Sequence, residues 1–263
     1  MPDHLRSASA RRVAITRPVP ASLAQCELTH LERVPIDVAR AAAQHDAYEA
    51  ALAALGCQVR RLPAADDLPD SVFVEDAAIV LDEVAVITRP GAESRRAERA
   101  SVAPMLSEYR ELLTIAAPGT LDGGDVLRLG RTLYVGLSTR TNEDGARQLS
   151  RLLQRFGYGV RCVQTSGCLH LKSAATALPD DRVLLNPSWL DARVFEPMEA
   201  VHVSPDEPDA ANVLRIGAAV VCAAVHTRTI ADLRARGYDV TTVDVSELAK
   251  AEAGVTCCSL LIE

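Results

Sequence analysis

The feature that most constrains this chain is a short pattern that recurs where three helical segments end. Leu55-Gly56-Cys57-Gln58-Val59 resembles Phe156-Gly157-Tyr158-Gly159-Val160 and Arg236-Gly237-Tyr238-Asp239-Val240. In each copy the glycine can adopt the left-handed conformation that ends a helix, and the chain can then turn directly into a strand. A helix exit repeated in this way predicts one structural unit used several times.

The segments between these exits complete the unit. Pairs of short apolar runs separated by turn residues predict β-hairpins at 72–81 with 84–88, 125–129 with 132–137, 171–178 with 182–185, and 212–216 with 219–223. Helical spacing predicts helices over 38–55 and 142–156 and, more weakly, over 96–113 and 227–236. Further strands are expected at 113–116 and 200–203, and a last strand at 257–262 can pair with 13–16.

The unit therefore consists of a hairpin, a helix and a strand. About five such units of ~50 residues fill the 263 residues, a period typical of closed arrays, and closure into a ring leaves few sheet edges exposed. No linker divides the chain, so we expect a single domain over residues 1–263, with residues 1–12 as a frayed N-terminus. The structural alternative is a doubly wound α/β sheet, which would alternate single strands with helices.

Charge and composition narrow the function. The chain carries 28 basic and 35 acidic residues, a net charge of −7, which argues against a general nucleic-acid binder. No run approaches the ~18 consecutive apolar residues of a membrane span, and no apolar signal core is evident. The seven cysteines form no CxxC motif and no secreted framework, so we expect a reducing compartment, the cytoplasm.

Polar residues recur at matching positions of the repeat. They are Asp76, Asp122, His170, Asn212 and Cys257, and the steps between them are 46, 48, 42 and 45 residues. Equivalent positions in a ring face a common axis, so these side chains are expected to converge although they are far apart in the chain. The alternative for Asp122-Gly123-Gly124-Asp125 is a simple turn, since aspartate and glycine both favour turns.

The converging residue types predict a chemistry. A cysteine thiolate is a nucleophile, a histidine transfers protons, and a carboxylate fixes the histidine tautomer. Further acids at Glu75 and Asp76 suit a guanidinium, whose donors form a rigid fork. The residues alone thus predict a cysteine hydrolase or transferase that acts on a cationic, guanidino-type substrate.

Several motifs resemble the dimethylarginine dimethylaminohydrolase family of the guanidino-group-modifying (pentein) superfamily, and the likeness extends from about residue 13 to 262. The motifs are Phe73-Val74-Glu75-Asp76, Ser94-Arg95-Arg96, Leu121-Asp122-Gly123-Gly124-Asp125, Ser138-Thr139-Arg140-Thr141-Asn142, Leu169-His170-Leu171-Lys172-Ser173 and Thr256-Cys257-Cys258-Ser259. The resemblance implies a five-bladed α/β-propeller.

The resemblance also implies a role for each matching residue. Cys257 matches the nucleophile, His170 the general acid and base, and Asp122 the carboxylate that orients the histidine. The implied substrate-binding residues are Glu75 and Asp76 for the guanidinium, Arg95 and Arg140 for the substrate carboxylate, and Asp70, Leu28 and Ala251 nearby. Residues 18–35 resemble an active-site lid. Glu252-Ala253-Gly254-Val255 departs from the Asp-Gly pair more common in the family.

These roles imply hydrolysis of methylated arginine to citrulline through a covalent thiouronium on Cys257. The alternatives are an arginine deiminase, an amidinotransferase, or a catalytically silent relative that binds a partner. No cofactor or catalytic metal is expected, although Zn²⁺ bound to Cys257 and His170 would inhibit. The expected partner is a small methylarginine, with neither nucleic acid nor membrane, and the protein is expected to be a monomer or homodimer.

Overall fold

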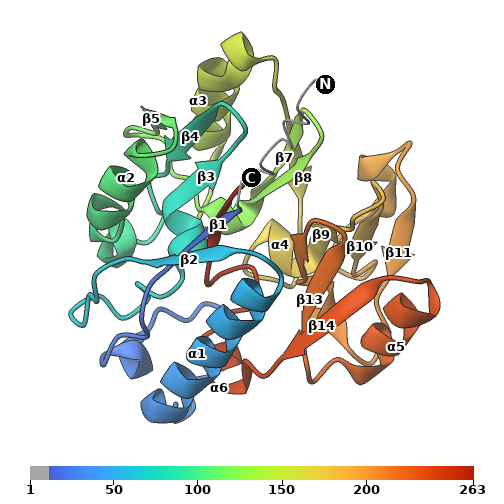
Figure 1. The fold of residues 1–263 in the computed structure, drawn as a ribbon. Helices are drawn as coiled ribbons and strands as arrows, with labels where there is room; N and C mark the ends of the chain where they lie inside the picture. Colours follow the sequence, from blue (N-terminus) through green and yellow to red (C-terminus); the bar gives the residue numbers. More distant parts are fainter. Residues whose placement is uncertain (1–11) are drawn as a thin grey trace, which may run out of the picture.

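A computed structural model describes residues 12–263 and shows a ring of small sheets (Figure 1). Within that range the strands form five three-stranded sheets, and every sheet has the same plan. A first strand pairs antiparallel with a middle strand, and the middle strand pairs parallel with a third. This is the five-bladed α/β-propeller expected from the sequence, and the doubly wound alternative is wrong.

The first blade joins the two ends of the described chain. It contains β15 (Leu260–Ile262), β1 (Val13–Thr16) and β2 (Gln58–Arg61). The other blades follow in chain order: β3 (Ala78–Val80), β4 (Val84–Ile87) and β5 (Glu111–Thr114); β6 (Val126–Leu129), β7 (Thr132–Leu137) and β8 (Gly159–Gln164); β9 (Ala175–Ala177), β10 (Val183–Leu185) and β11 (Ala200–His202); β12 (Leu214–Ile216), β13 (Ala219–Ala223) and β14 (Asp239–Val243). Because the last strand completes the first blade, the ring is closed.

A helix connects the middle strand to the third strand in four blades. These helices are α1 (Val38–Ala54), α2 (Arg99–Ser107), α3 (Glu143–Leu153) and α5 (Thr227–Ala235), and the fourth blade has the 3-10 turn η6 (Ala192–Phe195) instead. Asn142 caps α3 by accepting a hydrogen bond from the Gly145 N–H. The glycines of the three matching exits have φ values of 88°, 75° and 90°, which confirms the predicted left-handed turns.

The apolar core explains why the sheets form a ring. Middle strands such as β4 and β13 are buried at every position, so each blade must be covered on both faces. The described residues provide five apolar clusters, and each lies between neighbouring blades. Tyr134 packs on Phe195 between the third and fourth blades, with ring centroids 4.9 Å apart.

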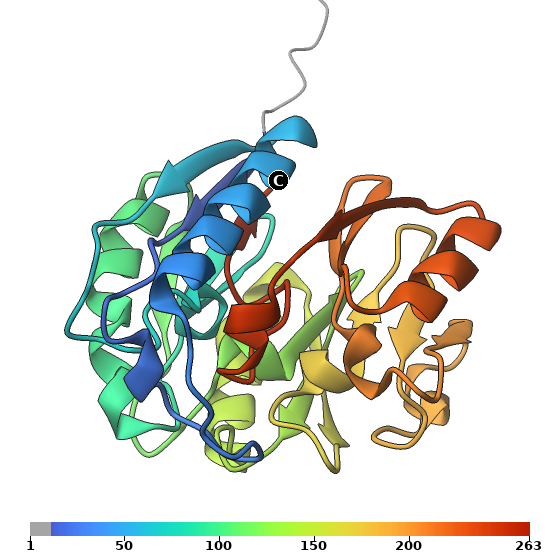
Figure 2. The same cartoon turned by 90° about the horizontal axis from the view of Figure 1, so that it is seen from below.

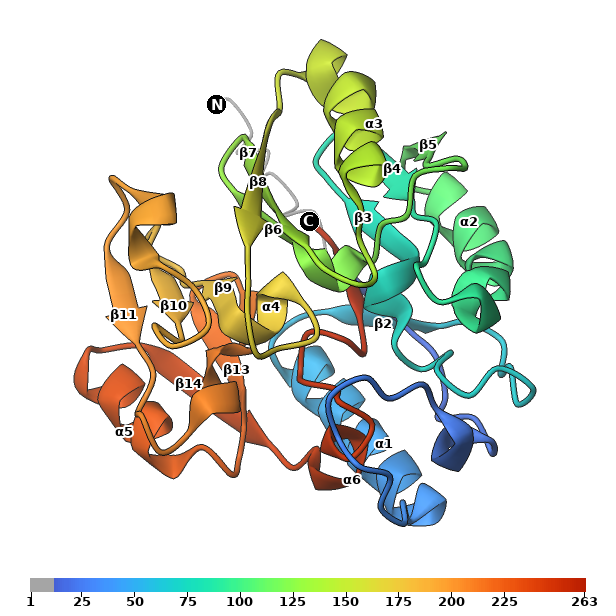
Figure 3. The ribbon, with the colours of Figure 1, turned by 180° about the vertical axis from the view of Figure 1, so that it is seen from behind.

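Short helical turns precede the first strands of four blades. They are η2 (Val74–Ala77), η4 (Gly123–Asp125), α4 (Leu171–Ala174) and η7 (Pro208–Ala211). Each turn contacts the next, so they form a layer around one end of the ring axis (Figure 3). The remaining short elements are η1 (Leu23–Gln25), η3 (Glu93–Ala97), η5 (Gln154–Phe156) and α6 (Ser246–Ala249).

Several predicted boundaries are wrong, most of them at these turns. Residues 74–77 and 171–174 were expected in strands but are helical. Cys257 was expected in the last strand but lies in a turn, and β15 begins only at residue 260. All four residues of η2 are buried, and such a run gives no alternation to distinguish a strand from a helical turn. The helix predicted over 96–113 is shorter, because α2 ends at residue 107. The strand predicted over 113–116, which is the third strand of that blade, begins at residue 111.

Candidate active site

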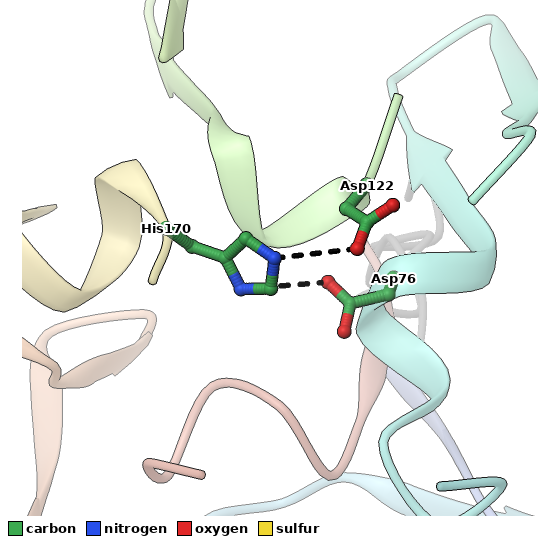
Figure 4. A group of neighbouring side chains, drawn as sticks. All are labelled: Asp76, Asp122 and His170. Atoms are coloured by element: carbon green, nitrogen blue, oxygen red, sulfur yellow. Dashed lines mark hydrogen bonds and ion pairs between the residues drawn. The ribbon is translucent and has the colours of Figure 1, made fainter. Parts of the chain in front are cut away.

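The imidazole of His170 faces two carboxylates from neighbouring blades (Figure 4). Its Nε2 is 3.3 Å from Asp122 Oδ2, and its Nδ1 is 4.0 Å from Asp76 Oδ1. Gly124 allows this approach, because a β-carbon there would lie 2.6 Å from the imidazole Nδ1. The three polar residues predicted to converge from separate repeats therefore lie together.

The charge of the imidazole follows from this arrangement. Burial opposes protonation, but the nearby carboxylates of Asp76, Asp125 and Asp122 raise the pKa of His170 to about 9. His170 is consequently a cation at neutral pH and can donate a proton to a leaving group. Asp125 also accepts hydrogen bonds from the Leu171 N–H and from Ser138 Oγ, and so fixes the turn that follows the histidine.

Asp76 is held by several donors at once. Arg95 Nη1 donates to its Oδ2 at 2.7 Å, and the Gly124 N–H donates to its Oδ1 at 2.9 Å. Burial opposes ionisation, but His170, Arg95 and the Gly124 N–H keep the pKa of Asp76 below its usual range. Asp76 therefore remains ionised beside the position that a cationic substrate would occupy.

Arg95 is occupied by protein partners. It forms a two-pronged ion pair with Glu98, at 3.0 and 2.9 Å, in addition to its bond to Asp76. Burial raises the pKa of Glu98, and although Arg95 opposes this shift the pKa is about 7. Arg95 lines the cavity, but most of its donors hold the protein together, so a role for it in binding the substrate carboxylate stays a prediction.

Cys257 lies in the turn before β15, and its side chain is half-buried. Burial and the charges of Glu75 and Asp76 raise the pKa of its thiol to about 12, although the Gly254 N–H, 3.4 Å from the sulfur, acts in the opposite direction. The free protein thus holds a neutral thiol. Cys258 is 1% exposed and packs in the apolar cluster between the first and fifth blades.

Glu75 is engaged differently from Asp76. Its carboxylate accepts from Lys172 Nζ at 2.6 Å and from Thr256 Oγ1 at 2.7 Å, while its N–H donates to the Cys257 carbonyl at 3.1 Å. It lines a cavity with Lys172 and Thr256 but does not line the one that contains Cys257. Asn212, the fourth of the recurring polar positions, forms hydrogen bonds with Thr256 and with the Lys172 carbonyl.

One small cavity brings most of the predicted residues together. Its lining includes Cys257, His170, Asp76, Asp70, Arg95, Arg140 and Ala251 from the predicted set, and Glu27, Phe73, Leu169, Glu252 and Ala253 in addition. Glu75, Leu28 and Asp122 are outside this lining, although Asp122 bonds to His170.

The predicted lid runs beside the cavity. Figures 2 and 3 show the dark-blue segment after β1 next to the red segment between α6 and β15. Asp70 accepts a hydrogen bond from the Glu27 N–H, and Arg140 Nη2 donates to Thr29 Oγ1 at 3.1 Å. Burial raises the pKa of Asp70, although nearby Arg95 opposes the shift. Leu28 is partly buried against the apolar cluster beneath the lid.

The potential metal ligands are a different set from the pair expected for Zn²⁺. Among the described residues, Asp76, Asp122 and His170 place ligand atoms within 4.8 Å of one another, and Cys257 is not a member of that group. This set consists of two oxygen donors and one nitrogen donor, without the soft thiolate that favours Zn²⁺. Zinc binding by Cys257 and His170 therefore stays a prediction.

Sequence reasoning missed Glu98, Asp125, Lys172 and Glu252 as functional candidates. Glu98 follows Arg95 by three residues, a spacing that brings two side chains onto one side of a helical turn, so this pair could have been found. Asp125 and Lys172 lie inside quoted motifs. Glu252 lies in the segment that departs from the family's Asp-Gly pair, but no local signal indicates its contact with the lid, because its partners are more than 220 residues away.

Comparison with known proteins agrees with the geometry. The family described as N,N dimethylarginine dimethylhydrolase, eukaryotic, matches residues 29–174. An N(G),N(G)-dimethylarginine dimethylaminohydrolase from Streptomyces coelicolor is 42% identical over 252 residues, 95% of this chain and 96% of that protein.

Two solved structures superpose closely. A cysteine-to-serine variant of the Pseudomonas aeruginosa enzyme complexed with citrulline has a TM-score of 0.90 and 34% identity, and covers 95% of this chain and 98% of its own. A dimethylarginine dimethylaminohydrolase with a histidine-to-glycine change, as an adduct with S-methyl-L-thiocitrulline, gives a TM-score of 0.89, 34% identity and the same coverage. The shared motifs, the fivefold ring and the match across nearly the whole length show that this chain belongs to the dimethylarginine dimethylaminohydrolase family.

Proposed function

We propose that this protein hydrolyses Nω-methylated arginines, asymmetric dimethylarginine and monomethylarginine, to citrulline and dimethylamine or methylamine. The observation that carries the proposal is the shared cavity of Cys257, His170 and Asp76, with Asp122 bonded to the histidine. A planar cation between a thiol and an ionised carboxylate is set for attack at its central carbon.

The first half-reaction forms a carbon–sulfur bond. The bound guanidinium lowers the pKa of Cys257, whose thiol loses its proton to solvent water, and the sulfur attacks the guanidinium carbon. Asp76 stabilises the charge of the reacting group, and Asp122 stabilises the imidazolium of His170. The imidazolium then protonates the methylated nitrogen, the carbon–nitrogen bond breaks, and a cationic thiouronium remains on Cys257.

The second half-reaction restores the thiolate. Neutral His170 removes a proton from water, and the resulting hydroxide adds to the thiouronium carbon. The carbon–sulfur bond breaks, the added hydroxyl loses its proton to solvent water as citrulline forms and leaves, and His170 retains the proton that it took from the attacking water. Water and substrate supply every atom, so the sequence of steps requires no cofactor. Zn²⁺ at Cys257 and His170 would block it.

The substrate contacts extend the proposal to the remaining residues. Arg140 lines the cavity and is 9% exposed on its side chain, so it is placed to hold the substrate carboxylate. Asp70 and the backbone at Ala251 would bind the α-amino group of the substrate. Leu28, within the lid over 18–35, would cover that group. Glu75 would act indirectly, because its N–H donates a hydrogen bond to the Cys257 carbonyl.

The proposal extends to the partners, the oligomeric state and the location of the protein. The partner is a small molecule rather than nucleic acid or a membrane, and the protein acts as a monomer or homodimer. No helix in residues 12–263 is long and apolar enough to cross a membrane. All seven cysteines are unpaired, which supports a reducing, cytoplasmic location. Residues 1–263 would form a single domain.

Citrulline release from arginine, monomethylarginine and asymmetric dimethylarginine, measured side by side, tests the proposal. We expect turnover of both methylated substrates and far less of arginine. Preferred turnover of arginine would indicate a deiminase, and transfer to an amine acceptor an amidinotransferase. Absence of turnover together with no labelling of Cys257 by 2-chloroacetamidine would indicate a catalytically silent binding protein.

A further inference from the structure

We propose that Glu252 is a positioning residue that latches the lid, residues 18–35, over the cavity that contains Cys257. The inference rests on the proposed function, because it concerns access of methylarginine to that cavity. It starts from a contact between the two ends of the described chain. Glu252 lines the cavity, and the segment that it binds lies more than 220 residues earlier.

The contact is made by three consecutive backbone donors of the lid. The Thr29 N–H is 3.0 Å from both carboxylate oxygens of Glu252, and the N–H groups of His30 and Leu31 are 2.5 and 2.6 Å from Oε1. Successive N–H groups that point at one anion form a concave anion-binding site. Hydrogen bonds to a charged acceptor are stronger than neutral ones.

Nothing else satisfies this carboxylate in the described part of the chain, where no arginine or lysine forms an ion pair with Glu252. Its backbone has a φ of 59°, a conformation that residues with a β-carbon rarely adopt. Its N–H donates to the Ala249 carbonyl at 3.1 Å, which fixes the turn after α6. The carboxylate is therefore presented to the lid by a strained, hydrogen-bonded turn.

Apart from the partly buried Leu28, apolar side chains contribute little to holding this part of the lid. Leu31 is 51% exposed and Val34 is 46% exposed. The other cavity residues that hold the lid contribute less, because Asp70 accepts only the Glu27 N–H and Arg140 donates only to Thr29 Oγ1. Three donors on one charge make Glu252 the main polar anchor of the segment over residues 27–31.

The position of Glu252 couples the lid to the nucleophile. Ala251 and Ala253, on either side of it, both line the cavity, and Cys257 follows five residues later in the same loop. Loss of the carboxylate should release the lid without removing any group that touches the reacting atoms. The closed state would then be less populated, and substrate would bind more weakly in proportion to that population.

Hydrogen exchange of the free protein tests the latch without turnover. Glu252→Ala removes the carboxylate, Glu252→Gly also relieves the positive φ, and Glu252→Gln keeps a neutral acceptor. We expect faster exchange at Thr29, His30 and Leu31 in the Ala and Gly variants and an intermediate rate in Gln. The control is Asp66→Asn, whose carboxylate accepts the single Ala21 N–H at the start of the lid and should leave residues 29–31 protected.

Steady-state kinetics with asymmetric dimethylarginine give the second measurement. In Glu252→Ala and Glu252→Gly we expect KM to rise on the order of tenfold while kcat changes less than about threefold. Unchanged exchange at residues 29–31 in folded Ala and Gly variants would overturn the latch. If the native protein does not turn over methylarginine but exchange increases as expected, the proposed function fails and the latch stands.

Discussion

The Nε2 atom of His170 lies 3.3 Å from Oδ2 of Asp122, although 48 residues separate them in the chain. The contact crosses from the third blade to the fourth, through the turns that precede their first strands. It exists only because the ring brings equivalent positions of the repeat together. Proton transfer in the proposed reaction depends on this contact.

Replacing Asp122 with Asn should lower the pKa of His170, because it removes one of the charges that raise it to about 9. In the variant the imidazolium of His170 would lose its proton at a lower pH, so the alkaline limb of the kcat profile should move to lower pH. We also expect kcat to fall by about 100-fold or more, measured as citrulline release across pH. Asp144→Asn, on the outer helix α3, is the control, and a native profile in Asp122→Asn would contradict the role.

Alkylation of Cys257 should depend on the charge of the reagent. Its thiol pKa of about 12 leaves little thiolate at neutral pH, so labelling by neutral iodoacetamide should be slow and should rise continuously from pH 7 to pH 10. Cationic 2-chloroacetamidine brings a charge that favours the thiolate and should react at least about tenfold faster at pH 7. Peptide mass spectrometry measures both rates at Cys257. Iodoacetamide labelling that levels off near pH 7 would argue against a neutral thiol.

Arg95 and Arg140 were both predicted to bind the substrate carboxylate, but their replacement should have different effects on stability. Arg95→Ala leaves the buried carboxylates of Asp76 and Glu98 without their partner, so it should destabilise the fold by about 3–5 kcal/mol. The Arg140 side chain donates one hydrogen bond, to Thr29, and lies 3.9 Å from Asp122. Arg140→Ala should therefore cost only about 1–2 kcal/mol but raise KM. Denaturant unfolding and steady-state kinetics separate the two effects, and equal stability losses would contradict this distinction.

Tyr48 should be needed to hold the turn that carries Cys257. Its hydroxyl contacts the Val255 carbonyl at 2.9 Å and Ser259 Oγ at 2.7 Å, on both sides of the nucleophile. Tyr48→Phe should lower the free energy of unfolding by about 1–2 kcal/mol and reduce kcat more than it changes KM. The control is Tyr109→Phe, which removes a hydroxyl that accepts a hydrogen bond from Arg60. A variant indistinguishable from the native protein would show that the turn is held without Tyr48.

The sequence alone predicted the repeat and the meeting of Asp76, Asp122 and His170, but Asn212, expected at the same place, does not line the cavity. Glycine exits and hairpin turns are local signals, and ring closure follows from the fivefold period of the repeat. The difference between Glu75 and Asp76 could not be predicted, because a 3-10 turn replaces the alternation of a strand. The pairing of Arg95 with Asp76 and the contact of Glu252 with the lid depend on distant segments, and no local pattern specifies them.

The central claim is that the sulfur of Cys257 attacks the substrate carbon, and citrulline release from asymmetric dimethylarginine by Cys257→Ser tests it most directly. Cys258→Ala, at the adjacent buried cysteine, is the matched control. The account predicts no measurable citrulline from Cys257→Ser and most of the native rate from Cys258→Ala. Undiminished turnover by a folded Cys257→Ser protein would contradict it.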